Sequence, residues 1–230
     1  MAPRLDRHVI GHLLAGAEVD AWGVAGNQPP LPLAPALPLA ISLMMRLDPE
    51  VVRGIADGPT PAYADEYRRL NDLLDQAAQT LAQTIKRHGY AAEAVPATVT
   101  DARADKLRFS HKSAATQAGL GWIGKTGLFV SERFGPAVRL ATVFTDLPLT
   151  AGRPVRSSRC GTCAACVKAC PAAAGRDVTW TAGMSRDQVI DVGACQRHLG
   201  AAPQEALRHL CGICIAACPR SHASGRSSEL

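Results

Sequence analysis

The clearest hydrophobic pattern in the chain predicts one long amphipathic helix, from about Ala62 to His88. Apolar residues recur there at intervals of three and four, which is the spacing of one face of an α-helix. Thr60 is suited to cap the first turn, Pro61 fits the first helical position, and Gly89 follows a basic last turn. The apolar stripe consists of Tyr63, Tyr67, Leu70, Leu74, Ala77, Ala78, Leu81 and Ile85.

Other patterns predict a mixture of helices and strands in the region before the cysteines. Residues 4–22 have a helical period, and residues 111–118 form a short helix that Ser110 can cap. A turn at Phe134-Gly135-Pro136 is expected to join the last two predicted strands. The predicted strands are residues 39–47, 90–95, 126–130 and 138–145. This mixture indicates an α/β or α+β domain.

Length and composition fit a folded protein with more than one part. The chain has 230 residues, of which 47% are hydrophobic and 20% charged, so it can bury a core and is not intrinsically disordered. We expect residues 1–152 to form the α/β domain and residues 153–222 a smaller second domain. The polar residues 223–230 are expected to be a mobile tail.

The sequence offers no pattern for a membrane span or a secretory signal. Its longest apolar run, Leu31 to Met45, has 15 residues and contains three prolines, so it is too short and too broken to cross a bilayer. The N-terminus carries Asp6, His8 and His12 where a secretory signal needs apolar residues. We therefore expect a cytoplasmic protein without membrane contact.

All 8 cysteines lie between Cys160 and Cys218, and none occurs before Cys160. A disulfide scaffold would instead spread its bridges over a small fold in an oxidising compartment. A large cysteine-free portion followed by a cysteine-dense one favours metal binding.

The cysteine spacing predicts two [4Fe–4S] clusters. The first run, Cys-x2-Cys-x2-Cys-x3-Cys-Pro, has the spacing of bacterial ferredoxins, in which the fourth cysteine ligates the other cluster. The first cluster would then take Cys160, Cys163, Cys166 and Cys218, and the second Cys170, Cys195, Cys211 and Cys214. Two structural zinc sites are the alternative, which the two Cys-x3-Cys-Pro endings disfavour.

The net charge of +5 is weak evidence for a nucleic-acid partner. No block of five like charges occurs, which is typical of an ordinary solvated surface. Each cubane with four thiolates carries about −2, so the net charge falls to about +1 once both clusters are bound.

Gly119, Gly121 and Gly124 form a literal G-x-G-x-x-G sequence. A dinucleotide site needs a strand before these glycines and a helix after them, whereas the pattern here predicts a helix before and a strand after. The glycines are therefore expected to allow a tight helix-to-strand turn anchored by Trp122 and Ile123.

Three segments together resemble the epoxyqueuosine reductase family. They are AGLGWIGK at 118–125, GPAVRLATVFTDLPL at 135–149, and the two cysteine runs. Members of that family are cobalamin-dependent iron–sulfur reductases of queuosine-tRNA biosynthesis, related to reductive dehalogenases. The resemblance covers roughly residues 60–220 and implies a nitroreductase-like α/β domain holding a corrinoid, followed by a ferredoxin-like domain with two [4Fe–4S] clusters.

The resemblance also implies roles for individual residues. Asp105 stands at the distance from Gly119 that the family's proton donor has, although its neighbours differ, and a solvated loop carboxylate is the other interpretation. His111 is a second candidate acid. Tyr63 and Tyr67 match tyrosines near the cofactor, but they equally fit the apolar stripe. The segment that would meet the cofactor comprises Gly119, Gly121, Trp122, Gly124 and Lys125, the last of which could also simply face solvent.

The function expected from these features is reduction of an epoxide or similar electrophile with electrons passed through both clusters to a corrinoid. A ferredoxin or flavodoxin would supply low-potential electrons, and the substrate would be a small molecule or a modified nucleoside. A tRNA partner is weakly supported, because the sequence stops twelve residues after Cys218 without the family's helical-repeat extension. The alternative is an electron-transfer protein without a corrinoid, whose first domain docks a partner; a flavin in that domain is a third interpretation.

Overall fold

The computed structural model describes residues 5–26, 36–97, 110–201, 207 and 209–222. Its contacts group the chain into two compact units, which we call unit 1 and unit 2. Unit 1 comprises Met1–Met45, Arg69–Leu120 and Arg139–Val155, and unit 2 comprises Arg46–Arg68, Gly121–Val138 and Arg156–Leu230. These units interleave along the chain, whereas the sequence suggests contiguous domains with a boundary at residue 152. That boundary stays a prediction, and Asp105 and the tail at 223–230 lie outside the described residues.

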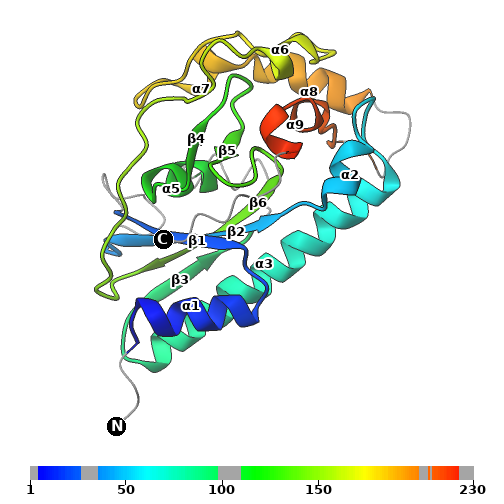
Figure 1. Cartoon of the computed structure of the whole chain (residues 1–230). Coiled ribbons are helices and arrows are strands. Elements are labelled where there is room, and N and C mark those ends of the chain that lie inside the picture. The colour runs from blue at the N-terminus through cyan, green and yellow to red at the C-terminus, as the bar shows by residue number, and fades with distance from the viewer. Residues whose placement is uncertain (1–4, 27–35, 98–109, 202–206, 208, 223–230) are drawn as a thin grey trace. The chain divides into compact units, whose positions relative to one another are not determined.

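Unit 1 is built on a four-stranded sheet with the order β1-β2-β6-β3 (Figure 1). Strand β1 runs antiparallel to β2, and β3 runs antiparallel to β6. The strands are β1 (Ala21–Gly26), β2 (Leu39–Arg46), β3 (Ala92–Val95) and β6 (Val138–Thr145). Helices α1 (Arg7–Gly16), α3 (Pro61–Arg87) and α5 (His111–Gln117) accompany the sheet.

Successive residues of β1 show how the sheet is covered. A methyl group added at Gly11 of α1 would contact the Trp22 ring, whereas one added at Gly23 would lie 3.1 Å from Ala118 at the end of α5. Because neighbouring strand residues point to opposite faces, α1 and α5 cover opposite faces of the sheet. The core on the α5 side includes the fully buried Phe144.

The long helix is confirmed as α3, with Thr60 accepting a hydrogen bond from the Tyr63 amide at 3.2 Å. The prediction of one helix over residues 4–22 is wrong in its second half. Helix α1 ends at Gly16, the backbone turns at Glu18 with φ of 59°, and β1 begins at Ala21. Val19, which is buried just before β1, happened to continue the helical period. Ser110 does precede α5, but its side chain makes no capping hydrogen bond.

Unit 2 contains a small hairpin and several short helices. The hairpin pairs β4 (Gly121–Ile123) with β5 (Phe129–Ser131). The predicted turn at Phe134-Gly135-Pro136 does lie between β5 and β6, but the two strands belong to different sheets: β5 pairs with β4, and 138–145 enters the sheet of unit 1 as β6. The helices are α2 (Pro49–Arg53), α6 (Ala165–Lys168), α7 (Arg186–Val189), α8 (Val192–Gly200), α9 (Ile213–Ala216) and the 3-10 helix η2 (Pro219–His222).

The cysteine-containing part of unit 2 buries little apolar surface. Among its described residues, the buried hydrophobic ones are Ala174, Val189, Ile190, Leu207 and Ala216. Such a sparse core gives little hydrophobic stabilisation, so the segment needs another source of order. Within the described residues, no helix is both long and apolar enough to span a bilayer.

Candidate metal centre in the cysteine-rich unit

All eight cysteines belong to unit 2, and none of them forms a disulfide. Cys163 is exposed, while the other seven are half-buried. Eight free thiols gathered in one small unit form a donor set suited to soft, thiolate-binding metals or to iron–sulfur clusters.

The charge interactions of the first group of thiols join both ends of the cysteine-rich sequence. Burial raises the pKa of Cys166, and the neighbouring Cys218, Cys160 and Cys163 raise it further. Burial likewise raises the pKa of Cys218, with smaller contributions from Cys160 and Cys163. These four residues are the set that the sequence assigns to one cluster.

A second group shows the same behaviour. Burial and the neighbouring Cys170 and Cys211 raise the pKa of Cys195. Burial raises the pKa of Cys214 to about 12, and Cys211, Cys166 and Cys170 add to the effect. The contribution of Cys166 shows that the two groups approach each other at these two thiols.

Two groups of four thiols match the ligand number of two cubane clusters. In a cubane, each cysteine binds a different iron, so the four sulfurs are spread around a bulky core. Thiols whose pKa is raised by their neighbours lose their protons once a positively charged metal core is bound.

The β4–β5 hairpin brings Trp122 to a cysteine. Trp122 is fully buried, and its indole N–H donates to the Sγ of Cys160 at 3.3 Å. The guanidinium groups of Arg220 and Arg159 lie over the Trp122 ring at 4.8 and 5.7 Å. The indole therefore has one orientation, with its only donor directed at a candidate cluster ligand.

The loop of the same hairpin places a cation beside the first group. The Lys125 side chain is 6% exposed, and its Nζ lies 2.8 Å from Oδ1 of Asp177. The hydrogen bond to Asp177 raises the pKa of Lys125, and Cys160 and Cys163 contribute smaller increases. Lys125 is therefore protonated at neutral pH, and it does not simply face solvent.

Thr126 and Asp177 are site residues that the sequence did not reveal. The Thr126 side chain hydrogen-bonds both Cys166 and Cys214, one thiol from each group, and lowers the pKa of each. The sequence feature that could have identified Thr126 is its position directly after Lys125, a predicted site residue. Asp177 is 52 residues from Lys125 in the chain, so only folding pairs the two.

The glycines of the hairpin allow this close approach. A methyl group added at Gly121 would lie 2.1 Å from the carbonyl oxygen of Val130, and one at Gly124 would lie 2.8 Å from the Val130 side chain and 3.8 Å from Cys160 Sγ. Gly119 has φ of +83° and ends the turn after α5. The predicted helix-to-strand turn is confirmed, and the element order of a dinucleotide fingerprint is not present around these glycines.

Tyr63 lies in unit 2 beside the turn that starts α9. It is 4% exposed, and a methyl group added at Gly212 would lie 3.3 Å from its ring. Tyr67 contacts the Tyr63 ring edge-on, with 6.3 Å between centroids. Tyr63 therefore supports the helix that carries Cys214, and a cofactor contact by either tyrosine stays a prediction.

His111 lies in unit 1 and has both ring nitrogens engaged. Nδ1 is 2.9 Å from Oγ1 of Thr142, and Nε2 is 2.8 Å from the carbonyl oxygen of Pro96. Burial lowers the pKa of His111 to about 4, and the Arg139 charge also lowers it, against a raising effect of the Pro96 hydrogen bond. The ring is therefore neutral at pH 7, with Nε2–H donating to Pro96.

Known proteins are similar to this chain in sequence and in fold. An epoxyqueuosine reductase of Pseudomonas aeruginosa is 33% identical over 178 residues, which are 74% of this chain and 48% of that protein. The chain is a relative of the epoxyqueuosine reductases. No protein-family model matches it. This chain also matches a tetrachloroethene reductive dehalogenase of Sulfurospirillum multivorans, with 34% identity over 117 residues, or 46% of this chain and 22% of that one.

Solved structures extend the similarity to the fold. A catabolic reductive dehalogenase matches with a TM-score of 0.77 and 20% identity, over 96% of this chain and 33% of its own. A selenomethionine-labelled epoxyqueuosine reductase matches with a TM-score of 0.59 and 18% identity, over 96% of this chain and 68% of its own. The mixed α/β fold is thus shared with both groups of reductases. The chain spans about half the length of the Pseudomonas relative.

Proposed function

We propose that the chain is an iron–sulfur oxidoreductase that passes electrons through two [4Fe–4S] clusters to a corrinoid, which reduces an epoxide or a similar electrophile. The grouping of the eight thiols into two sets, each drawing on both cysteine runs, carries the proposal. The similarity to proteins named epoxyqueuosine reductase and reductive dehalogenase supports it.

The cysteines would bind the clusters, and side chains of the β4–β5 hairpin would adjust the reduction potential. Cys160, Cys163, Cys166 and Cys218 would bind one cluster, and Cys170, Cys195, Cys211 and Cys214 the other. The Trp122 indole donates toward Cys160, and the Lys125 ammonium adds positive charge near Cys160 and Cys163. Hydrogen bonds and positive charge at the sulfurs favour the reduced, more negative state of a cluster, so both groups would raise its reduction potential.

The corrinoid would use the segment from Gly119 to Lys125 in a nitroreductase-like domain. When bound, it would supply a strong cobalt-centred nucleophile for reducing an electrophilic carbon. In this proposal Asp105 protonates the leaving oxygen as a general acid. His111 is neutral at pH 7 and donates its Nε2 proton to Pro96, which favours positioning of the loop that carries Pro96 over proton transfer.

A modified nucleoside is the best-supported substrate class. One similar solved structure is an epoxyqueuosine reductase with an epoxyqueuosine-modified stem loop of a tyrosine tRNA. That complex supports an epoxide on a nucleoside, with a small molecule as the other substrate class. A ferredoxin or flavodoxin would donate electrons in the cytoplasm, because clusters of this kind persist in a reducing compartment.

Anaerobic reconstitution followed by titration with cob(II)alamin tests the proposal in two steps. About eight iron atoms per chain, with the electron paramagnetic resonance (EPR) signals of reduced [4Fe–4S] clusters, are expected first. A change of the cobalt signal to a base-off form at one equivalent is expected next, and it would justify a substrate screen that begins with epoxyqueuosine. Intact clusters with an unchanged cobalt signal would favour the electron-transfer alternative, and a chain that takes up zinc but no cluster would refute both.

A further inference from the structure

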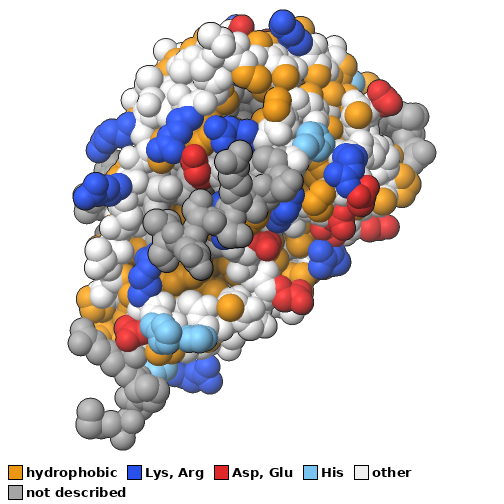
Figure 2. Space-filling view, viewed as in Figure 1, with side chains coloured by type: hydrophobic (Ala, Val, Ile, Leu, Met, Phe, Trp, Pro, Cys, Tyr) orange, Lys and Arg blue, Asp and Glu red, His pale blue; other side chains and the backbone are white. Residues whose placement is uncertain are grey.

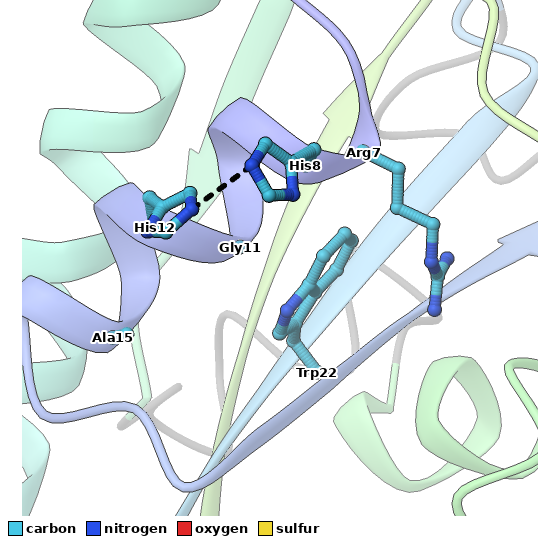
Figure 3. A pocket seen from close by; sticks show the side chains of 6 residues that line it. All are labelled: Arg7, His8, Gly11, His12, Ala15 and Trp22. Atoms are coloured by element: carbon cyan, nitrogen blue, oxygen red, sulfur yellow. Dashed lines mark hydrogen bonds between the residues drawn. The ribbon is translucent and has the colours of Figure 1, made fainter. Parts of the chain in front are cut away.

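Two histidines stand one helical turn apart on the exposed side of α1. His8 and His12 are four residues apart, and their Nε2 atoms are 3.0 Å apart. Their rings meet edge to face, with centroids 4.4 Å apart (Figure 3). Histidine side chains also gather at the surface over α1 in the space-filling view (Figure 2). The pair lies in unit 1 and belongs to none of the chemistry described above.

The distance between the two nitrogens suits joint coordination of one ion. Imidazole nitrogens bind Zn²⁺ at about 2.0–2.1 Å, so two of them on adjacent coordination positions are roughly 3 Å apart. In the metal-free protein the pair shares one N–H between the two Nε2 atoms. A metal bound to both nitrogens would sit beside the line that joins them, so the exposed rings would rotate toward it while their nitrogens stay about 3 Å apart.

The helix that presents the pair is well anchored. The Asp6 carboxylate caps α1 by accepting hydrogen bonds from the amides of His8 and Val9. On the opposite side of the helix, Ile10 and Leu14 are fully buried. The spacing of the two histidine backbones is therefore fixed by a capped helix packed on the core, which lowers the entropy lost on binding.

The surroundings leave room for further ligands. The histidines line a surface pocket of about 610 Å³ together with Arg7, Gly11, Ala15 and Trp22. The Arg7 guanidinium lies 4.5 Å from the centroid of the Trp22 ring, which forms the facing wall (Figure 3). No group of three metal-binding side chains occurs in the described part of the chain, so water or an incoming anionic ligand would fill the other positions.

We propose that His8 and His12 form a two-histidine site for a divalent transition-metal ion such as Zn²⁺ or Ni²⁺, with its open coordination positions facing the pocket. Imidazole is a good ligand for both ions. The site is independent of the clusters and the corrinoid, so it stands whether or not the proposed function does.

Zn²⁺ titration by calorimetry tests the site, using the full chain without an affinity tag and with its clusters reconstituted. The variants are His8→Gln, His12→Gln and the double variant, with His88→Gln, in the turn after α3, as the control for a histidine outside the pair. Either single substitution is expected to weaken binding about a hundredfold, because the remaining imidazole loses the advantage of chelation. The double variant should lose little more, and the control should bind as the wild type does.

A second readout excludes binding at the cysteines, which are identical in every variant. Zn²⁺ should raise the unfolding temperature of the wild type and of the His88→Gln control but not that of the single variants. Circular dichroism spectra that match the wild type would show that the exposed substitutions leave the fold intact. Equal zinc affinity in the wild type and the double variant would overturn the proposal, and so would a loss in the double variant equal to the sum of the two single losses in free energy.

Discussion

Single side chains of the hairpin control the surroundings of Cys160. Trp122 has one polar atom, and its proton is directed at Cys160 Sγ. Lys125 keeps its charge at neutral pH because Asp177 accepts from its ammonium group. Neither residue can ligate a metal, so their effect on a bound cluster is electrostatic.

Trp122→Phe should lower the reduction potential of the cluster bound by Cys160. We expect the hydrogen bond to stabilise the reduced cluster more than the oxidised cluster by about 1 kcal/mol. Its loss would therefore lower the reduction potential by about 40 mV for a one-electron couple. A redox titration followed by EPR measures this shift. Trp180→Phe is the matched control, because within the described residues the Trp180 indole makes no hydrogen bond, and its backbone carbonyl accepts one from the Ser158 amide. A potential that Trp122→Phe leaves unchanged would contradict a tuning role.

His111 should make the stability of the chain depend on pH. Its folded-state pKa of about 4 lies below the ordinary value of 6.5, so the unfolded chain binds more protons between these values, and stability falls as the pH falls through this range. This histidine alone should lower the free energy of unfolding by about 2 kcal/mol between about pH 8 and pH 5. Urea unfolding followed by circular dichroism should show this loss in the wild type and a flatter dependence in His111→Gln. Equal slopes would count against a buried neutral ring.

At the scale of elements, the β4–β5 hairpin connects the glycine segment to the cysteines. Its strands are only three residues each, and its loop carries both Lys125 and Thr126. Thr126 reaches one thiol from each group, so a displaced hairpin would disturb both groups at once. The close pairing of the strands depends on the missing side chain at Gly121.

Gly121→Ala should open this hairpin. Its methyl group would overlap the Val130 carbonyl, and the shift needed to relieve the overlap should cost about 2–3 kcal/mol. The unfolding temperature and the iron content after reconstitution should both fall. Gly26→Ala in β1 is the control, because among the described residues beyond its chain neighbours no atom lies within 4 Å of the added methyl group, and its effect should stay within about 0.5 kcal/mol. Similar effects of the two substitutions would show that the hairpin tolerates a side chain.

At the scale of the molecule, the two cysteine runs depend on each other. Few hydrophobic residues are buried in the described part of 156–222, so bound clusters would supply much of the order in that segment. Because each thiol group takes members from both runs, neither run forms a complete group by itself.

Substitution of single cysteines tests whether each cluster takes its ligands from both cysteine runs or from one run alone. Cys163→Ala and Cys218→Ala should each remove the same cluster, leaving about four iron atoms and the same residual EPR spectrum. Cys195→Ala should leave the other cluster and a different spectrum. If Cys218→Ala and Cys195→Ala instead left matching spectra, each run would bind its own cluster.

The sequence by itself determined the features that depend on local spacing. Cysteine intervals identified the donor set, three-and-four periodicity identified α3, and helix-like residues before the glycines excluded a dinucleotide loop. These signals are reliable because their physical cause lies within a few residues: a helical turn, a cap, or the reach of neighbouring thiols around one metal core.

Only the tertiary structure decided which distant groups meet. It paired β5 with β4 instead of with 138–145, because Gly121 admits the Val130 carbonyl at close range. It joined Lys125 to Asp177, placed Thr126 between the two thiol groups, and buried His111 between Thr142 and Pro96. These contacts join residues far apart in the chain, and the free energy that selects them comes from packing and charge interactions that form only when the chain folds.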